Sequence, residues 1–142
     1  MKIILLFILV VLLITTIKNT PLNLSKTIWK KNRTKVFCDD NIFEKEVSEE
    51  YKQAYCTAAM ILIILEIIFY IIVGTKIGTN FSAALSAIEI LLEIRCFAYS
   101  VSDISNAVIF NEDTYKFRRW HNLFNVCFNY VYLIYTIWAL MR

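Results

Sequence analysis

Glycine and proline are almost absent from this sequence, which has 2 Gly and 1 Pro in 142 residues. It therefore offers no glycine-rich loop of the kind that holds phosphate groups. The 4 cysteines are widely separated, with no CxxC pair and no histidine at zinc-ligand spacing. We expect no metal and no cofactor, and a disulfide between Cys38 and Cys56 only if their loop faces an oxidising compartment.

Charged residues are also few, at 19% of the chain, and 15 Lys and Arg nearly balance 12 Asp and Glu. The basic residues form no face with interleaved aromatic side chains, so we expect no nucleic-acid partner. No nucleophile is paired with a base, which makes an enzyme the weakest class. Hydrophobic residues make up 58% of the chain, and a lipid bilayer is the natural solvent for such a composition.

Four apolar segments predict an all-α integral membrane protein, a four-helix transmembrane bundle in a single membrane domain. We expect the spans at residues 3–17, 54–74, 81–101 and 120–140. The last three have the roughly 20 residues that a crossing requires, whereas the first is shorter. The first segment fits an uncleaved anchor or a signal-peptide core. We favour the anchor because its positive charges follow the apolar run and no small-x-small cleavage site is present.

Lysine and arginine are distributed unevenly between the expected loops. The loops at residues 18–53 and 102–119 carry eleven of them, against Lys2, Lys76 and Arg142 on the other side. The positive-inside rule places the two larger loops in the cytoplasm and both termini outside it. We therefore expect a multi-pass protein of a cell membrane.

The loop at residues 18–53 begins with a basic half that contains no acid. Its residues Lys30, Lys31, Arg33 and Lys35 are expected to bind anionic lipid headgroups. The alternative is an ordinary juxtamembrane retention signal that binds nothing in particular.

The second half of the same loop is acidic and predicts the start of a helix. Asn41 followed by Glu44 matches the pattern of a capping box. Apolar residues continue at helical spacing at Phe43, Val47 and Tyr51. We expect a helix that begins near Ile42 and runs without a break into the second span.

Polar residues recur three or four positions apart in the last two spans. In the third span they are Ser82, Ser86, Glu89, Glu93, Cys96, Ser100 and Asp103. In the fourth they are Arg118, His121, Asn125, Asn129, Tyr132 and Thr136. A helix turns about 100° per residue, so each set forms one stripe, and we expect the two stripes to face each other inside the bundle.

A candidate polar site combines these stripes with Glu66, the only charge in the second span. Its expected members are Glu66, Glu89, Glu93, Asn125, Asn129 and Tyr132, with Asp103, Arg118 and His121 at the cytoplasmic edge. Three carboxylates cannot all stay ionised in a low-dielectric site, so we expect one to be neutral or to share a proton. Arg95 lies nearly opposite Glu93 around its helix, and we expect it to extend toward the cytoplasmic edge or to pair with another subunit.

From this pattern we expect an accessory or interaction subunit, and the alternative is a transporter or channel subunit. Polar residues between helices commonly hold helices together, which favours an accessory or interaction subunit in a homo-oligomer or a larger membrane complex. Intramembrane acids are costly and often mark ion or proton pathways, which favours a minimal proton- or cation-coupled transporter or channel subunit.

Small residues recur four positions apart at Ser82 and Ser86 and at Ala83 and Ala87. This spacing permits close contact with a copy or a partner helix. Gly74 and Gly78 have the same spacing, but they lie where a span ends, so we expect them to be turn residues.

Overall fold

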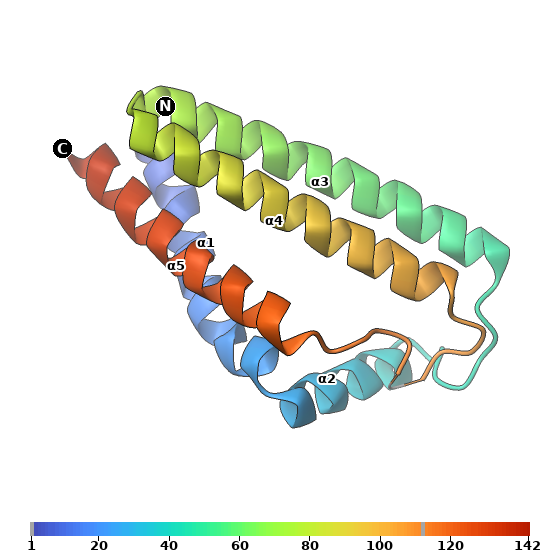
Figure 1. The fold of residues 1–142 in the computed structure, drawn as a ribbon. Helices are drawn as coiled ribbons and strands as arrows, with labels where there is room; N and C mark the ends of the chain where they lie inside the picture. The colour runs from blue at the N-terminus through green and yellow to red at the C-terminus, as the bar shows by residue number, and fades with distance from the viewer. Residues whose placement is uncertain (1, 112) are drawn as a thin grey trace.

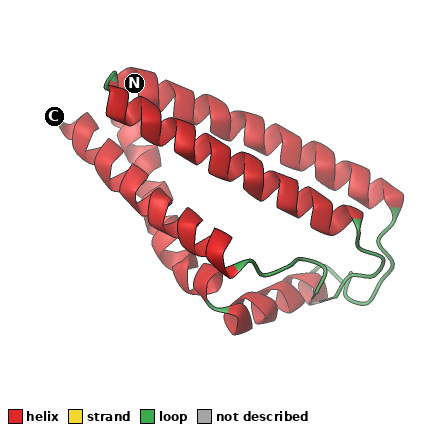
Figure 2. Cartoon of the chain, in the orientation of Figure 1, coloured by secondary structure: helices red, strands yellow, loops and turns green. Residues whose placement is uncertain are grey.

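Residues 2–111 and 113–142 are described by the computed structural model, and this part of the chain is helical without strands, as expected (Figure 2). It forms five helices rather than four: α1 (Lys2–Leu24), α2 (Lys26–Asp39), α3 (Glu49–Ile77), α4 (Asn80–Ser105) and α5 (Arg119–Met141). Of these, α1, α3 and α5 are long and apolar enough to cross a membrane. The 26-residue α4 is equally long, but Glu89, Glu93 and Arg95 make it more polar.

The four long helices are arranged as two pairs. The helices α3 and α4 lie side by side as an antiparallel hairpin, and α5 runs alongside α1 (Figure 1). The two pairs meet at the end of the molecule that carries both termini, and they diverge toward α2 and the loops (Figure 1). We call these the closed end and the loop end. Both termini therefore lie at the closed end.

An apolar core joins all four long helices at the closed end. Its buried members are Leu5, Leu9, Tyr70, Val73, Leu85, Tyr132, Leu133 and Leu140. Leu9 and Val73 have no exposed surface. Side chains from all four long helices therefore pack together at the closed end.

The hairpin between α3 and α4 depends on small residues. Gly78 ends α3 with a left-handed φ of 72°, which is the turn role expected for it. Gly74 is different, because a Cβ there would lie 2.8 Å from the Ser86 Oγ. The Ser82 hydroxyl also donates to the Gly74 carbonyl oxygen at 3.2 Å. The expected turn role of Gly74 is wrong: it is a buried helix residue that lets α4 approach α3.

The start of α3 also differs from expectation. A helix from Ile42 is wrong, because Asn41 and Glu44 both have positive φ values, 55° and 60°, which no α-helix contains. The helix begins at Glu49, after Ser48 in an extended conformation, whose side chain accepts a hydrogen bond from the Tyr51 N–H.

The segment before α3 pairs with the loop before α5 instead. The Glu44 and Val47 N–H groups donate to the carbonyl oxygens of Phe110 and Val108, at 2.7 and 2.9 Å. Val47 and Phe43, two of the three apolar residues with helical spacing, thus pack into a second core at the loop end, whereas Tyr51 is exposed. Its buried members are Trp29, Phe37, Val47, Ile104, Phe110 and Tyr115.

A helix within residues 18–53 was expected only beside the second span, so α2 is a further correction. The first helix continues past residue 17 to Leu24, and Ser25 then adopts an extended conformation that caps α2. This break redirects the chain, and Trp29 and Phe37 bury one side of α2 in the loop-end core. The cysteines Cys38 and Cys56 are both free.

Candidate functional site

The two polar stripes lie on the inner faces of α4 and α5. Of the α4 stripe, Ser82, Ser86, Glu89 and Asp103 are buried, and Glu93, Cys96 and Ser100 are half-buried. Of the α5 stripe, His121, Tyr132 and Thr136 are buried, and Arg118, Asn125 and Asn129 are half-buried. A strip of polar side chains therefore runs from the loop end into the bundle.

Part of the expected carboxylate site lines one cavity, which we call the inner cavity. Glu66 of α3, Glu93 of α4, and Asn125 and Asn129 of α5 share this space of about 220 Å³. Glu66 is exposed as a whole residue, but it borders the cavity. Neither glutamate forms a hydrogen bond or an ion pair with any residue that the structure describes.

The other two expected members, Glu89 and Tyr132, do not line the inner cavity. Glu89 is only 1% exposed, and both of its carboxylate oxygens lack a hydrogen-bond partner among the described residues. Tyr132 is fully buried, its hydroxyl likewise lacks a partner, and its ring meets the Tyr70 ring at 5.1 Å. These two residues lie where the stripes enter the closed-end core.

A second cavity of about 160 Å³, the edge cavity, lies nearer the loop end. It is lined partly by Cys96 and His121, whose Sγ and Nε2 atoms are 3.1 Å apart. The Asn125 amide donates to the same sulfur at 3.3 Å. Asn23 and Asn125 line both cavities. The edge cavity and the inner cavity are therefore neighbours in one polar interior.

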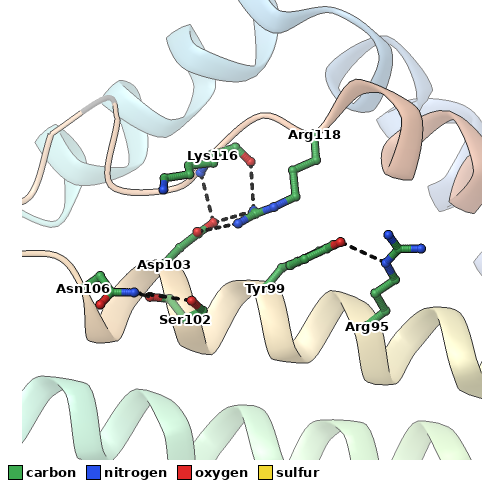
Figure 3. A network of polar contacts seen from close by, with 7 residues as sticks. All are labelled: Arg95, Tyr99, Ser102, Asp103, Asn106, Lys116 and Arg118. Carbon is green, nitrogen blue, oxygen red and sulfur yellow. Dashed lines mark hydrogen bonds and ion pairs between the residues drawn. The ribbon is translucent and has the colours of Figure 1, made fainter.

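Asp103 and Arg118 form the outer wall of the edge cavity. The two guanidinium nitrogens of Arg118 donate to the two Asp103 oxygens at 2.6 and 2.7 Å, and the Lys116 N–H adds a third bond at 3.0 Å (Figure 3). Asp103 lies two residues beyond the expected span. Burial raises the pKa of its carboxyl, but the hydrogen bonds from Arg118 and Lys116 outweigh burial and hold the pKa below its usual value.

The expected headgroup-binding residues on α2 do not share one direction. Arg33 lines the edge cavity, and its guanidinium carbon lies 4.8 Å from the centre of the Tyr115 ring. The Lys30 ammonium contacts the Asp113 carboxylate at 2.8 Å. Lys31 and Lys35 are exposed. Arg33 therefore belongs to the interior of the loop end, while the exposed lysines remain candidates for lipid contact.

Sequence reasoning missed the contribution of α1 to the inner cavity. Thr15, Thr16, Asn19 and Asn23 of α1 line it opposite the carboxylates. The four-residue steps between Thr15, Asn19 and Asn23 were a usable signal. They were overlooked because the apolar run ends at residue 17, whereas the helix does not.

The polar interior is suited to some ligands and not to others. Among the described residues, no group of three or more His, Cys, Asp or Glu side chains could hold a metal ion. The inner cavity instead combines two carboxylates with amide and hydroxyl groups, which suit a proton or a small hard cation. In comparisons with known proteins, no family model, no curated protein and no solved structure matches this chain.

Proposed function

We propose that this chain is a multi-pass membrane protein in which α1, α3, α4 and α5 cross the bilayer and the inner cavity binds and passes on protons or small monovalent cations. Glu66 and Glu93 are the binding groups in this proposal. The loop end, with the basic helix α2 and with Lys116, Arg118 and Arg119, lies on the cytoplasmic side.

The observation that carries this proposal is the unpaired state of the two cavity carboxylates. Polar groups that only hold helices together do so by bonding to each other or to the neighbouring backbone. Thr20 and Tyr130 are an example here, with hydroxyl oxygens 2.8 Å apart between α1 and α5. Glu66 and Glu93 form no such bond with a described residue, although they face one cavity from two helices. A proton or cation between them would offset their mutual repulsion.

The edge cavity gives this site a route to the cytoplasm. Asn23 and Asn125 border both cavities, and His121 and Cys96 stand between Asn125 and the Asp103–Arg118 pair. Arg118 is paired with Asp103, but Arg33 and Lys116 make the mouth of this route positive. This charge opposes the entry of a metal cation more than the relay of a proton. We therefore favour the proton over a metal cation.

The test is proton flux in liposomes that contain a pH-sensitive dye, with K⁺ and valinomycin holding the membrane potential at zero. We expect the protein to dissipate a pH step faster than protein-free liposomes do, and without a Na⁺ gradient. Glu93→Gln and Glu66→Gln should each abolish this flux because an amide cannot ionise.

The matched control is Glu46→Gln, which changes an exposed acid of the loop end and should leave the flux unchanged. Gel filtration in detergent checks that all variants keep the folded yield of the wild type. The proposal is wrong if flux does not exceed that of empty liposomes, or if it survives both substitutions. Flux that requires a Na⁺ gradient would replace the proton by a cation.

A second candidate function, an interaction subunit, is favoured by a different face of α4. Ala83 and Ala87 are exposed there, one turn apart, so a helix of another subunit can approach closely. Ala87→Cys should then form a crosslinked dimer in membranes if a second copy occupies this face, whereas Val131→Cys, on the exposed side of α5, should not.

A further inference from the structure

Arg95 is a charged residue of α4 that points out of the bundle. It is exposed, and no acidic side chain among the described residues pairs with it. The nearby acid Asp103 is paired with Arg118, so it does not compensate the charge of Arg95. A guanidinium on the lipid-facing side of a span is costly unless it reaches an anion or water.

The side chain of Arg95 stands out from α4, and the Tyr99 side chain leans toward it (Figure 3). The Arg95 Nε donates to the Tyr99 hydroxyl at 2.9 Å, one turn nearer the C-terminus of α4 (Figure 3). Arg95 also borders a groove together with Trp120, which lies at the end of α5. The Nε bond leaves the terminal nitrogens of the guanidinium available, in the fork geometry that binds phosphate.

A groove between α4 and α5 runs from this guanidinium. It encloses about 340 Å³ and is lined by Leu92, Arg95, Trp120, His121, Phe124 and Phe128. Trp120 and Phe124 are 72% and 56% exposed, and Trp120 is at the end of α5 where an indole favours the headgroup level. The apolar wall from Trp120 to Phe128 extends about 12 Å along the helix, so it can accommodate part of an acyl chain.

We infer that this groove is a binding site for an anionic phospholipid, with the lipid phosphate on Arg95 and an acyl chain along Phe124 and Phe128. Charge complementarity selects this occupant: the groove has one unpaired cation at its headgroup end and an apolar wall below it. The site is separate from the inner cavity, with which it shares no lining residue, although His121 also lines the edge cavity. It is separate also from the exposed lysines of α2.

Quenching of Trp120 by brominated lipids tests the site. The variant Trp29→Phe with Trp138→Phe leaves Trp120 as the one tryptophan of the chain. It is reconstituted into phosphatidylcholine vesicles that contain a minor fraction of either phosphatidylglycerol or phosphatidylcholine, brominated near the carbonyl end of the chain. We expect the brominated anionic lipid to quench Trp120 more strongly. Arg95→Gln should remove this excess.

Arg119→Gln is the matched control, because Arg119 is exposed beside Trp120 but does not line the groove. The excess quenching should persist in this variant, and also when the α2 residues Lys31 and Lys35 are changed to Gln. Equal quenching by the two lipids would overturn the inference, and so would an excess that survives Arg95→Gln or is lost in Arg119→Gln. If neither brominated lipid quenches Trp120, the inference is also wrong, and a protein partner covers this face instead.

Should the double tryptophan variant not fold, 5-fluorotryptophan in the otherwise unchanged chain provides three ¹⁹F resonances. Trp120 is then identified by Trp120→Phe. Its resonance should shift with phosphatidylglycerol but not with phosphatidylcholine or inorganic phosphate, and Arg95→Gln should abolish the shift. A shift with inorganic phosphate alone would show that the acyl groove is not involved.

Discussion

The closed end and the loop end use the same four long helices in different ways. At the closed end, Gly74 and Ser82 let α3 and α4 touch, and Leu9 and Val73 exclude water completely. Toward the loop end the two helix pairs stand apart, and the stripes of α4 and α5 line the inner and edge cavities (Figure 1). The helices are therefore in close contact where they carry small and apolar residues, and the two pairs separate where they carry polar residues.

This difference has a consequence for stability and function. The two ends are held by packing in the closed-end core and by the Asp103–Arg118 pair with the loop-end core. The carboxylates between the ends contribute no described bond that holds helices together. We expect the ends to determine stability and the middle to tolerate substitution, and the predictions below test that division.

The largest loss should come from Asp103→Asn at the loop end. It removes the charge that pairs with Arg118, and the cost should be about 3 kcal/mol, the low end for breaking a buried ion pair, because Arg118 keeps some contact with water. Reversible unfolding in mixed SDS micelles measures it. Asp113→Asn, which changes a mostly exposed pair with Lys30, should cost less than about 1 kcal/mol.

The Asp103 contribution should also depend on pH. Because its folded-state pKa is lowered, the stabilisation is present above the unfolded-state pKa of about 3.9 and is lost as the pH falls through the lower folded value. The difference between wild type and Asp103→Asn should therefore be full at neutral pH and should shrink below pH 4. A constant difference down to the most acidic pH would contradict this account.

The next effect should come from Gly74→Leu at the closed end. A Cβ at this position already lies 3.3 Å from the Ser86 Cβ, so a larger side chain must separate α3 from α4, at a cost of about 2 kcal/mol. Thr75→Leu, on the exposed side of α3, is the control. Gly74→Ala should be rescued by Ser86→Ala, which removes the nearest atom. If Ser86→Ala does not restore the stability of Gly74→Ala, the strain does not come from the contact with Ser86.

A smaller effect of opposite sign is expected where the stripes enter the closed-end core. Glu89 is buried without a described partner for either carboxylate oxygen, so Glu89→Leu should stabilise the protein by about 1 kcal/mol. Glu93→Leu, at the cavity wall, should change stability less. Thermal unfolding in detergent compares the two variants. A loss of stability in Glu89→Leu would show that the carboxyl has a partner which holds the fold together.

Local periodicity made the inner faces of α4 and α5 predictable. Within one helix, the spacing of residues such as Glu89, Glu93 and Asp103 is enough to show that they share one face. The loop end was not predictable in this way. Asn41 and Glu44 match a capping box locally, but both have positive φ values. Asn41 follows the C-terminal end of α2 and donates to the Cys38 carbonyl oxygen, and the Glu44 N–H donates to the distant Phe110 carbonyl oxygen. The α1 wall of the inner cavity was missed for a related reason, since packing extends that helix seven residues past its apolar run.

The smallest effect on stability should be that of Asn129→Leu. Its comparison with Asn122→Leu contrasts a residue that borders the cavity with a hydrogen-bonded residue on the same helix. Asn129 borders the inner cavity and forms no described hydrogen bond, so a leucine has room and leaves no partner unpaired. The free energy of unfolding of this variant should differ from that of the wild type by less than about 0.5 kcal/mol. Asn122 donates to the Asn23 carbonyl oxygen at 3.1 Å, and Asn122→Leu should cost about 1 kcal/mol. Equal losses in the two variants, measured by thermal unfolding in the same detergent, would mean that the middle of the bundle is held together by its polar groups after all.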